Sequence, residues 1–312
     1  MSIALSLICP VYKVADFIPD LMNSLLAGVN SSSVEVIFVD DCCPDNSIAI
    51  CEQFLSDHLD NILFKAVVLK QATNQGQAVA RNAALKIAEG EYIGFVDSDD
   101  AIAPHYWQTL AKYVEQADND IIEFSFAEFA QNVPVVTDTS GVELRSSQLN
   151  PFYSGFFVWT RLYNKAVVTN LSFPAGMIYE DIYFNIHAFA KAKTSLRLSH
   201  TLLFYRKRKG STTNGRTSSY ASLLHNMTSA IAATLSSFKQ QDIVMLQAAR
   251  YALLVTLKGF TITERNDRKV FFKECHGIIS LFRPLFNEFN KSNISALKLR
   301  VSSMICVFGG KL

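Results

Sequence analysis

The first 130 residues alternate between apolar runs of strand length and helical patterns. Four β-branched-rich runs are predicted strands, at residues 3–11, 34–39, 63–69 and 92–96. Between them, apolar residues recur at helical spacing from about Phe17, Ile48 and Ala80 onward. A helix over 104–116 and a strand over 121–126 continue the alternation. This order predicts an α/β fold with a doubly wound sheet, which binds ligands at the carboxyl ends of its strands.

The pattern weakens after residue 130, which predicts three regions. They are a ligand-binding sheet half at 1–130, a second half at 131–217 and a helical C-terminal region at 218–312. The net charge is +1, but residues 1–130 hold 19 acids against 6 Lys and Arg, whereas residues 131–312 hold 9 acids against 23. The basic part predicts an anionic partner, such as lipid phosphates or an acceptor that carries pyrophosphate.

Residues 294–312 mix basic and apolar side chains as a helix on a membrane surface does, and a last helix packed on the core is an equally good interpretation. Strand-like sequence begins directly after Met1, and no apolar run reaches the roughly 20 residues of a membrane-spanning helix. We therefore expect a cytoplasmic protein, with contact at the inner face of the cytoplasmic membrane as an option. The six cysteines form no C-x-x-C pair and are predicted to be free thiols.

The fourth predicted strand ends in the sequence D-S-D-D at residues 97–100. It places Asp97, Asp99 and Asp100 together where a doubly wound sheet binds its ligand. Crowded carboxylates raise one another's pKa, so the arrangement is costly unless a cation offsets it. Oxygen ligands of this kind suit Mg²⁺ or Mn²⁺ bound through carboxylates and substrate phosphates. The alternative is a turn that caps the next helix.

Two further elements carry polar side chains. The second predicted strand ends in Asp40 and Asp41, and a carboxylate there can accept the N3 hydrogen of uracil or ribose hydroxyls. The following P-D-N-S sequence also fits a plain turn into a helix. Residues 74–82 (N-Q-G-Q-A-V-A-R-N) place Gly76 at a helix start and Arg81 one to two turns later. Arg81 is placed to pair with phosphate or the strand-end aspartates, or it lies on a solvated face.

These elements together resemble the inverting glycosyltransferases of family 2, with the GT-A fold, of the type that builds bacterial capsule, lipopolysaccharide and O-antigen. The matching segments are I-C-P-V-Y-K, V-D-D with D-N-S, N-x-G-x-x-x-A-R-N-x-A and F-V-D-S-D-D, in this order over about 100 residues. The chain departs from the family pattern at Cys42 and Cys43, where small residues are usual.

The resemblance implies roles for individual residues. Asp41 holds uracil, Arg81 lies near the uracil and diphosphate, and Asp97 with Asp99 forms the D-x-D site for Mn²⁺ or Mg²⁺. The implied donor-binding set is Pro10, Val11, Tyr12, Asp40, Asp41, Asn74, Gly76, Arg81, Asp97, Ser98, Arg206 and Arg208.

The resemblance continues more weakly to about residue 213. Residues 173–184 (F-P-A-G-M-I-Y-E-D-I-Y-F), preceded by W-T-R-L-Y-N at 159–164, look like the family's acceptor-side E-D motif. Asp181 is the predicted general base, and Glu180 orients it or binds the acceptor. Two acids at a helix N-terminus are an equally simple interpretation. The basic loop at 205–213 is predicted to close over the donor diphosphate, and a solvated turn or a lipid-binding patch is the alternative.

The sequence therefore predicts an inverting, metal-dependent hexosyl- or N-acetylhexosaminyltransferase that uses a UDP-sugar and a saccharide or lipid-linked saccharide acceptor in surface polysaccharide synthesis. Two alternatives are a sugar nucleotidyltransferase and a non-catalytic scaffold with the same fold. The nucleotidyltransferase is disfavoured because P-V-Y-K-V-A-D replaces the glycine-rich loop expected after the first strand. Nucleic-acid binding is disfavoured by the acidic first half, and a homo-oligomer remains open.

Overall fold

A computed structural model describes residues 2–135, 139–145, 155–208, 230 and 234. The chain divides into two compact units, Met1–Thr217 and Ser218–Leu312. The first unit holds the fold described below. The predicted C-terminal helical region, its amphipathic segment and the part of the basic loop after residue 208 lie outside the described residues, apart from the isolated Ala230 and Thr234.

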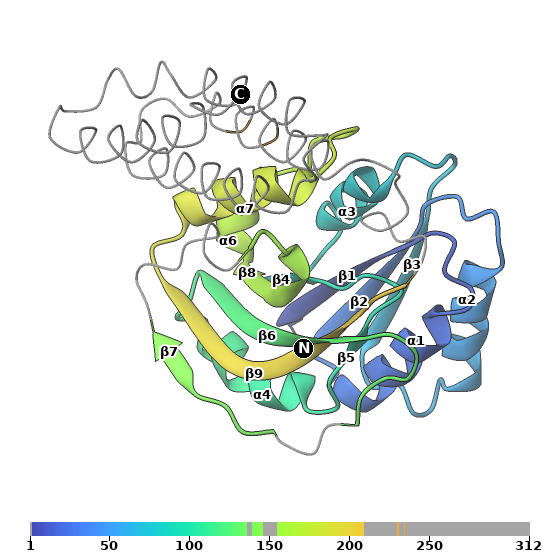
Figure 1. Cartoon of the computed structure of the whole chain (residues 1–312), viewed down its shortest axis with the longest axis horizontal. Helices are drawn as coiled ribbons and strands as arrows, with labels where there is room; N and C mark the ends of the chain where they lie inside the picture. The colour runs from blue at the N-terminus through green and yellow to red at the C-terminus, as the bar shows by residue number, and fades with distance from the viewer. Residues whose placement is uncertain (1, 136–138, 146–154, 209–229, 231–233, 235–312) are drawn as a thin grey trace, which may run out of the picture. The chain divides into compact units, whose positions relative to one another are not determined.

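Nine strands of the described residues form one mixed sheet, in the order β3-β2-β1-β4-β8-β6-β9-β5 with β7 paired to β9 (Figure 1). The strands are β1 (Leu5–Val11), β2 (Val34–Asp40), β3 (Lys65–Lys70), β4 (Tyr92–Phe95), β5 (Ala101–Ile102), β6 (Ile121–Phe129), β7 (Glu143–Arg145), β8 (Arg161–Asn164) and β9 (Ser195–Arg206). Strands β3, β2, β1 and β4 are parallel to one another, whereas β8 pairs antiparallel with β4 on one side and with β6 on the other. The mixed α/β sheet confirms the predicted fold class.

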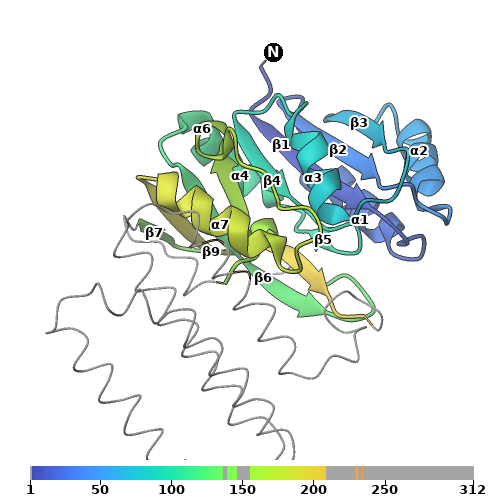
Figure 2. The ribbon, with the colours of Figure 1, turned by 90° about the horizontal axis from the view of Figure 1, so that it is seen from above.

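The helices cover both faces of the sheet. They are α1 (Ile18–Gly28), α2 (Ser47–Asp57), α3 (Gln77–Leu85), α4 (Tyr106–Gln116), α6 (Lys165–Val168) and α7 (Glu180–Lys191), with a 3₁₀ turn at Val158–Thr160. Side chains alternate across β1: Leu7 packs in one core layer with residues of α1, α2 and α4, whereas Ile8 packs in the other with residues of α3, α6 and α7. Figure 2 shows α3 and α7 in front of the central strands. This double covering explains the near-continuous apolar strands read from the sequence.

The register brings the ends of three parallel strands to one edge. Val11 of β1 lies opposite Asp40 of β2, and Ile8 lies opposite Phe95 of β4. Val96 continues the β4 pairing by donating its N–H to the carbonyl of Ile8 (3.0 Å). The residues that follow β1, β2 and β4 therefore meet at the carboxyl edge, as the sequence predicts.

Candidate functional site

The segment after β4 turns sharply and presents two of its three carboxylates to solvent. The N–H of Asp100 bonds to the carbonyl of Asp97 (3.1 Å), which closes the turn before β5. The side chain of Asp97 is 28% exposed and that of Asp99 is 19% exposed, whereas Asp100 is fully buried. The D-x-D pair thus faces outward, and the third carboxylate supports the turn from inside.

Each exposed carboxylate is paired with one arginine. Arg81 Nη2 lies 2.9 Å from Asp97 Oδ1, and Arg208 Nε lies 2.6 Å from Asp99 Oδ2. Burial and the neighbouring Asp97 raise the pKa of Asp99, and Arg208 lowers it in part. The predicted pairing of Arg81 with a strand-end aspartate is therefore present, and Arg208 makes a second such pair.

Asp100 is the buried member of the acidic cluster. Its Oδ1 accepts a hydrogen bond from the backbone N–H of Arg206 (2.8 Å), and its Oδ2 has no hydrogen-bond partner among the described residues. Burial, followed by the charges of Asp97 and Asp99, raises its pKa well above the usual value. Three acids with this mutual repulsion form a site that a cation would stabilise.

The carboxylates of Asp97 and Asp99 suit a metal ion whose other ligands are not protein side chains. Among the described residues, no group of three or more His, Cys, Asp or Glu side chains is arranged to hold a metal ion. Asp97 and Asp99 each have one oxygen engaged with an arginine, so this pair offers a Mg²⁺-type ion only part of its coordination shell. Phosphate oxygens and water supply the rest at such sites.

Arg206 occupies a structural position that differs from the predicted donor-binding one. Its guanidinium donates to the carbonyls of Asp99 (Nε, 2.7 Å) and Gln131 (Nη1, 3.1 Å) and pairs with Asp20. It is 3% exposed and lies 4.3 Å from the centre of the Phe129 ring. Because its N–H groups bond to protein oxygens, Arg206 holds the acidic turn against α1 and β6. Of these two arginines near the end of β9, Arg208 is the one whose side chain pairs with a D-x-D carboxylate.

Asp41 organises the loop that leads into α3. It is 2% exposed and accepts three hydrogen bonds, from Asn74 Nδ2 (2.9 Å) and from the backbone N–H groups of Gln75 (2.9 Å) and Gly76 (2.8 Å). Gly76 has φ +86°, a conformation that L side chains rarely adopt. The structure thus brings together Asp41, Asn74 and Gly76, which the sequence placed in the donor-binding set.

The neighbouring Asp40 supports the turn after β2. It is 9% exposed, and its Oδ1 accepts from the N–H of Cys43 (2.8 Å). In the same turn Asp45 Oδ1 accepts from the N–H of Ser47 (3.1 Å) at the start of α2. The turn interpretation of P-D-N-S is therefore confirmed, and it coexists with an aspartate pair at the strand end.

The residues at the end of β1 differ in how far their side chains are exposed at this edge of the sheet. Tyr12 is 37% exposed, and Pro10 is half-buried. The side chain of Val11, a member of the predicted donor-binding set, lies fully buried in the core. Ser98 is also buried, within the acidic turn. Tyr12 is thus the best-exposed side chain of this predicted group.

Glu180 and Asp181 form the first turn of α7. Glu180 Oε1 accepts from Gln77 Nε2 (2.6 Å) and from Arg81 Nη1 (2.9 Å), so it faces α3. Burial, followed by the charge of Glu180, raises the pKa of Asp181 to about 7. Tyr179 just before them has φ +67°, a strained conformation of the kind found at functional sites. A carboxylate with a pKa near neutrality suits a general base.

Two sets of contacts in this region were not predicted. Gln77 joins Arg81 in binding Glu180, and a buried group of polar residues around Arg161 connects β8, β6 and α7. The sequence carried a signal for the second set, because Arg161 interrupts an aromatic and apolar run that otherwise suits a buried strand.

The structure defines a doubly wound α/β domain with carboxylates and arginines at the carboxyl edge of its parallel strands, and comparison with known proteins assigns the family. The family model described as glycosyl transferase family 2 matches residues 6–169. That is more than half of the chain, and the chain belongs to glycosyltransferase family 2. The match is consistent with a glycosyltransferase and does not support the nucleotidyltransferase alternative.

Curated relatives agree with this class. The chain is 32% identical to the glycosyltransferase EpsJ of Bacillus subtilis over 67% of this chain and 62% of that protein. It is 27% identical to the glycosyltransferase GlyA of Streptococcus pneumoniae over 66% of this chain and 31% of that protein. The poly(ribitol-phosphate) β-N-acetylglucosaminyltransferase TarS of Staphylococcus aureus is 29% identical over 66% and 36%, respectively. The match thus spans less than two thirds of each of these three relatives.

Solved structures confirm the fold. The structure of S. aureus TarS 1-349 with UDP-GlcNAc has a TM-score of 0.69 at 23% identity, with 90% of this chain and 81% of that chain covered. The mannosyltransferase PcManGT of Pyrobaculum calidifontis, with GDP-Man and Mn²⁺, has a TM-score of 0.58 at 12% identity, with 91% and 82% covered. Both are similar to this chain in fold.

Within residues 2–135, 139–145 and 155–208, no helix is long and apolar enough to cross a bilayer.

Proposed function

We propose that this protein transfers a sugar from a UDP-sugar to a saccharide or lipid-linked saccharide, with inversion at the anomeric carbon. One observation carries the proposal. Arg81 contacts Asp97 of the D-x-D pair and Glu180, which precedes the candidate base Asp181. The buried guanidinium of Arg81 thus contacts one carboxylate on the proposed donor side and one on the proposed acceptor side. The TarS structures with UDP and UDP-GlcNAc support UDP as the nucleotide.

The donor is expected to lie along the carboxyl edge of β1, β2 and β4. Asp41 shapes the loop at Asn74 and Gly76, and a carboxylate offers about four acceptor positions, of which three are used here. One position therefore remains for a nucleobase N–H. Arg208 is placed to reach the diphosphate, because it already lies against Asp99.

Asp97 and Asp99 are the proposed ligands of a Mn²⁺ or Mg²⁺ ion, which neutralises the leaving diphosphate when bound. Burial is the main cause of the raised pKa of Asp99 and Asp100, and the charges of neighbouring carboxylates add to it. The second contribution supports this assignment, because a bound cation offsets the repulsion. The PcManGT structure with Mn²⁺ is a precedent for this fold.

Asp181 is the proposed general base. Its carboxylate takes the proton of the acceptor hydroxyl as that oxygen forms a bond to the anomeric carbon. The bond from this carbon to the diphosphate oxygen breaks, and the nucleotide diphosphate leaves with both electrons of that bond. An attack from the opposite face converts an α-linked donor into a β-linked product. Glu180 is held by Gln77 and Arg81 and orients the first turn of α7.

We further propose that the acceptor belongs to a surface polysaccharide and that transfer takes place in the cytoplasm or at the inner face of the membrane. The name of TarS, which acts on poly(ribitol-phosphate), supports an anionic surface polymer as one acceptor class. The excess of Lys and Arg after residue 130 favours the same chemistry.

The proposal is tested by transfer and slow donor hydrolysis over a panel of nucleotide sugars, with and without Mn²⁺. We expect a UDP-sugar to be turned over, EDTA to stop the reaction, and Asp99→Asn and Asp181→Asn each to abolish transfer. Only Asp181→Asn should retain metal-dependent UDP binding. Absence of metal-dependent UDP binding by the unmodified protein would instead favour a scaffold.

A further inference from the structure

A buried polar network surrounds Arg161, the first residue of β8. Arg161 is fully buried, and its Nε and Nη2 lie 2.9 and 2.7 Å from Glu123 Oε2 on β6. Glu123 is itself 3% exposed and also lies 3.4 Å from Arg197 Nε. The positive charge of Arg161 is thus compensated by Glu123, and its two terminal nitrogens also donate to other parts of the chain.

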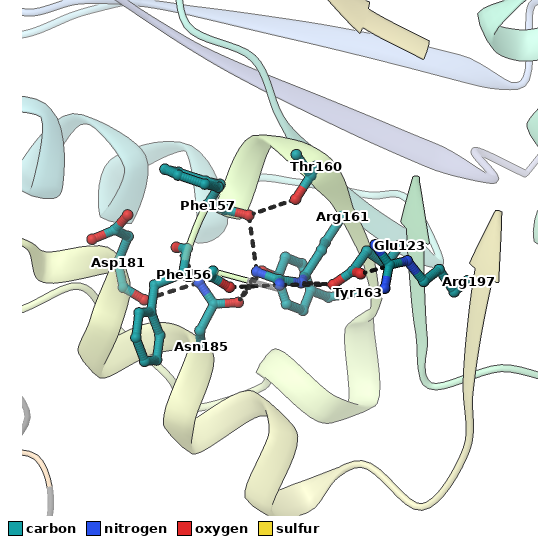
Figure 3. Close-up of polar contacts among 10 residues, drawn as sticks. Glu123, Phe156, Phe157, Thr160, Arg161, Tyr163, Asp181, Asn185 and Arg197 are labelled. Carbon is teal, nitrogen blue, oxygen red and sulfur yellow. Dashed lines mark hydrogen bonds and ion pairs between the residues drawn. The ribbon is translucent and has the colours of Figure 1, made fainter. Parts of the chain in front are cut away.

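Asn185 connects this arginine to the first turn of α7. Its Oδ1 accepts from Arg161 Nη1 (2.9 Å) and from the hydroxyl of Tyr163 (2.8 Å). Its Nδ2 donates to the carbonyls of Asp181 (3.0 Å) and Phe156 (2.7 Å). All four hydrogen-bonding positions of the amide are therefore used, as Figure 3 shows. The amide orientation is fixed, because a flipped amide would oppose two donors.

The same network holds three successive backbone carbonyls. Arg161 Nη2 donates to Gly155 O (2.7 Å), Asn185 Nδ2 to Phe156 O, and Arg161 Nη1 to Phe157 O (3.0 Å). Outside regular secondary structure, three consecutive carbonyls bound by buried side chains are a strong constraint on the chain. The segment 155–157 is therefore fixed to β8 and to α7 at once.

This segment carries an exposed aromatic surface. Phe157 is 40% exposed, and its ring stacks on Trp159 (centroids 4.8 Å apart), which stacks on Tyr205 of β9 (5.2 Å). An exposed ring backed by two more aromatic rings is a rigid apolar face, and it lies in the segment that the network joins to Asp181.

We propose that Arg161 and Asn185 are positioning residues for the transfer step. They hold the turn of α7 that bears Asp181 in register with the segment 155–157, whose Phe157 ring faces the acceptor sugar. The inference rests on the proposed function, because it takes Asp181 as the base. It adds that the geometry between base and acceptor is set by a buried network that touches neither substrate.

The test compares two substitutions at one hydrogen-bonded pair. Asn185→Leu keeps the number and branching of the heavy atoms but removes all four hydrogen bonds of the amide, including those to the carbonyls of Asp181 and Phe156. Tyr163→Phe removes only the bond to Asn185 Oδ1 and leaves the bond between Asn185 and Asp181. Each variant is assayed for kcat, donor KM and UDP-binding stoichiometry. If Asn185→Leu does not fold, Asn185→Asp replaces it, because it keeps the two accepted bonds and loses the two donated ones.

We expect kcat per UDP-binding site to fall at least tenfold in Asn185→Leu, with donor KM within about twofold, and to change less than threefold in Tyr163→Phe. The kcat of Arg161→Lys should lie between those of the two variants, because one ammonium group cannot make all five hydrogen bonds of the guanidinium. A loss in Asn185→Leu that merely follows the fraction of sites able to bind UDP would overturn the proposal. Asp181→Asn separates the two proposals: if it stays active, the base assignment is wrong, and if it is inactive while Asn185→Leu is normal, only the positioning role is wrong.

Discussion

Arg81 and Glu180 form a buried ion pair, with Nη1 and Oε1 2.9 Å apart, although they are 99 residues apart in the chain. The other terminal nitrogen of the same guanidinium binds Asp97 at 2.9 Å. Arg81 is 3% exposed, and its positive charge compensates carboxylates from two different parts of the fold. The planar guanidinium suits this bridge, since its two terminal nitrogens point to different partners.

Replacing Arg81 by Lys should therefore break the connection that Arg81 makes between Asp97 and Glu180. A single ammonium group cannot span both carboxylates, so we expect weaker UDP binding together with a lower kcat. Arg81→Met should cost about 3–5 kcal/mol of stability, because it leaves a buried carboxylate uncompensated. Calorimetric UDP titration and thermal unfolding measure both effects. Lys86→Met at the exposed end of α3 is the matched control, and an equal effect there would contradict the bridge.

The pH dependence of turnover should report on Asp181. Its pKa is raised to about 7, chiefly by burial and by the charge of Glu180, so only part of the protein carries the ionised base at neutral pH. We expect kcat to rise with pH through an acid limb near pH 7 and to level off above it. Rates measured from pH 5 to 9 at saturating Mn²⁺ and donor test this. A limb that persists in residual activity of Asp181→Asn would belong to another group.

The same shift predicts a pH-dependent stability difference. Since the pKa of Asp181 is about 7 in the folded protein, against an ordinary value of 3.8 for an aspartate, folding makes ionisation of this carboxyl less favourable. The destabilisation is absent below the lower pKa, grows as pH rises between the two, and is complete above about pH 7. Asp181→Asn should therefore unfold at a higher temperature than the unmodified protein at pH 8 and at nearly the same temperature at pH 4. Glu115→Gln, on the far surface of α4, should show no such difference.

Asp41 offers a separate test of the donor side. Removing its carboxylate leaves the N–H groups of Gln75 and Gly76 without their acceptor. Because both bonds are only partly buried, the cost should be less than the roughly 1–3 kcal/mol of a fully buried donor left unpaired. Asp41→Ala should lower thermal stability and weaken UDP binding together. Asp45→Ala in the neighbouring turn should lower stability with little change in UDP affinity. Unchanged UDP binding in Asp41→Ala would remove this residue from the donor site.

The doubly wound part of the sheet followed from local sequence. Strand and helix periods in the first 100 residues determine which faces are apolar, and the register then brings the ends of β1, β2 and β4 together, so Asp41 and Asp97 could be placed at one edge from the sequence. The same reasoning could not give the later sheet order, in which β8 lies between β4 and β6 and β6 pairs with β9, because those contacts join segments distant in the chain.

The hydrogen-bond and ion-pair partners of individual side chains could not be predicted from the sequence pattern either. A basic run at the end of β9 gives no means of telling an arginine that faces the core from one that faces the ligand. Strand alternation does not decide it either, because the two arginines are two residues apart and β9 ends at Arg206. In the structure Arg206 points inward to Asp20 and Phe129, whereas Arg208, beyond the end of the strand, reaches Asp99. The partners of Arg161 come from β6 and α7, so its role required the tertiary structure.

The pair between Arg208 and Asp99 predicts competition with the metal ion. Arg208 Nε lies 2.6 Å from Asp99 Oδ2, so a cation that binds this carboxylate must share or displace the guanidinium. Arg208→Gln should therefore bind Mn²⁺ more tightly than the unmodified protein in the absence of UDP. An ion pair of this exposure contributes on the order of 1 kcal/mol, which corresponds to a roughly fivefold change in affinity. Turnover should fall in the same variant, because the diphosphate loses a cationic partner.

Mn²⁺ titration in the absence and presence of UDP measures this competition. Lys70→Gln removes an equal charge from β3, where Lys70 pairs with Glu52, and should leave Mn²⁺ affinity unchanged. Asp99→Asn should lose most of the Mn²⁺ affinity whether or not Arg208 is present. If Arg208→Gln bound Mn²⁺ no better than the unmodified protein, the arginine and the ion would not compete for Asp99. If it bound Mn²⁺ more tightly but kept full turnover, Arg208 would only occupy the ion's place before binding and would have no part in stabilising the leaving group.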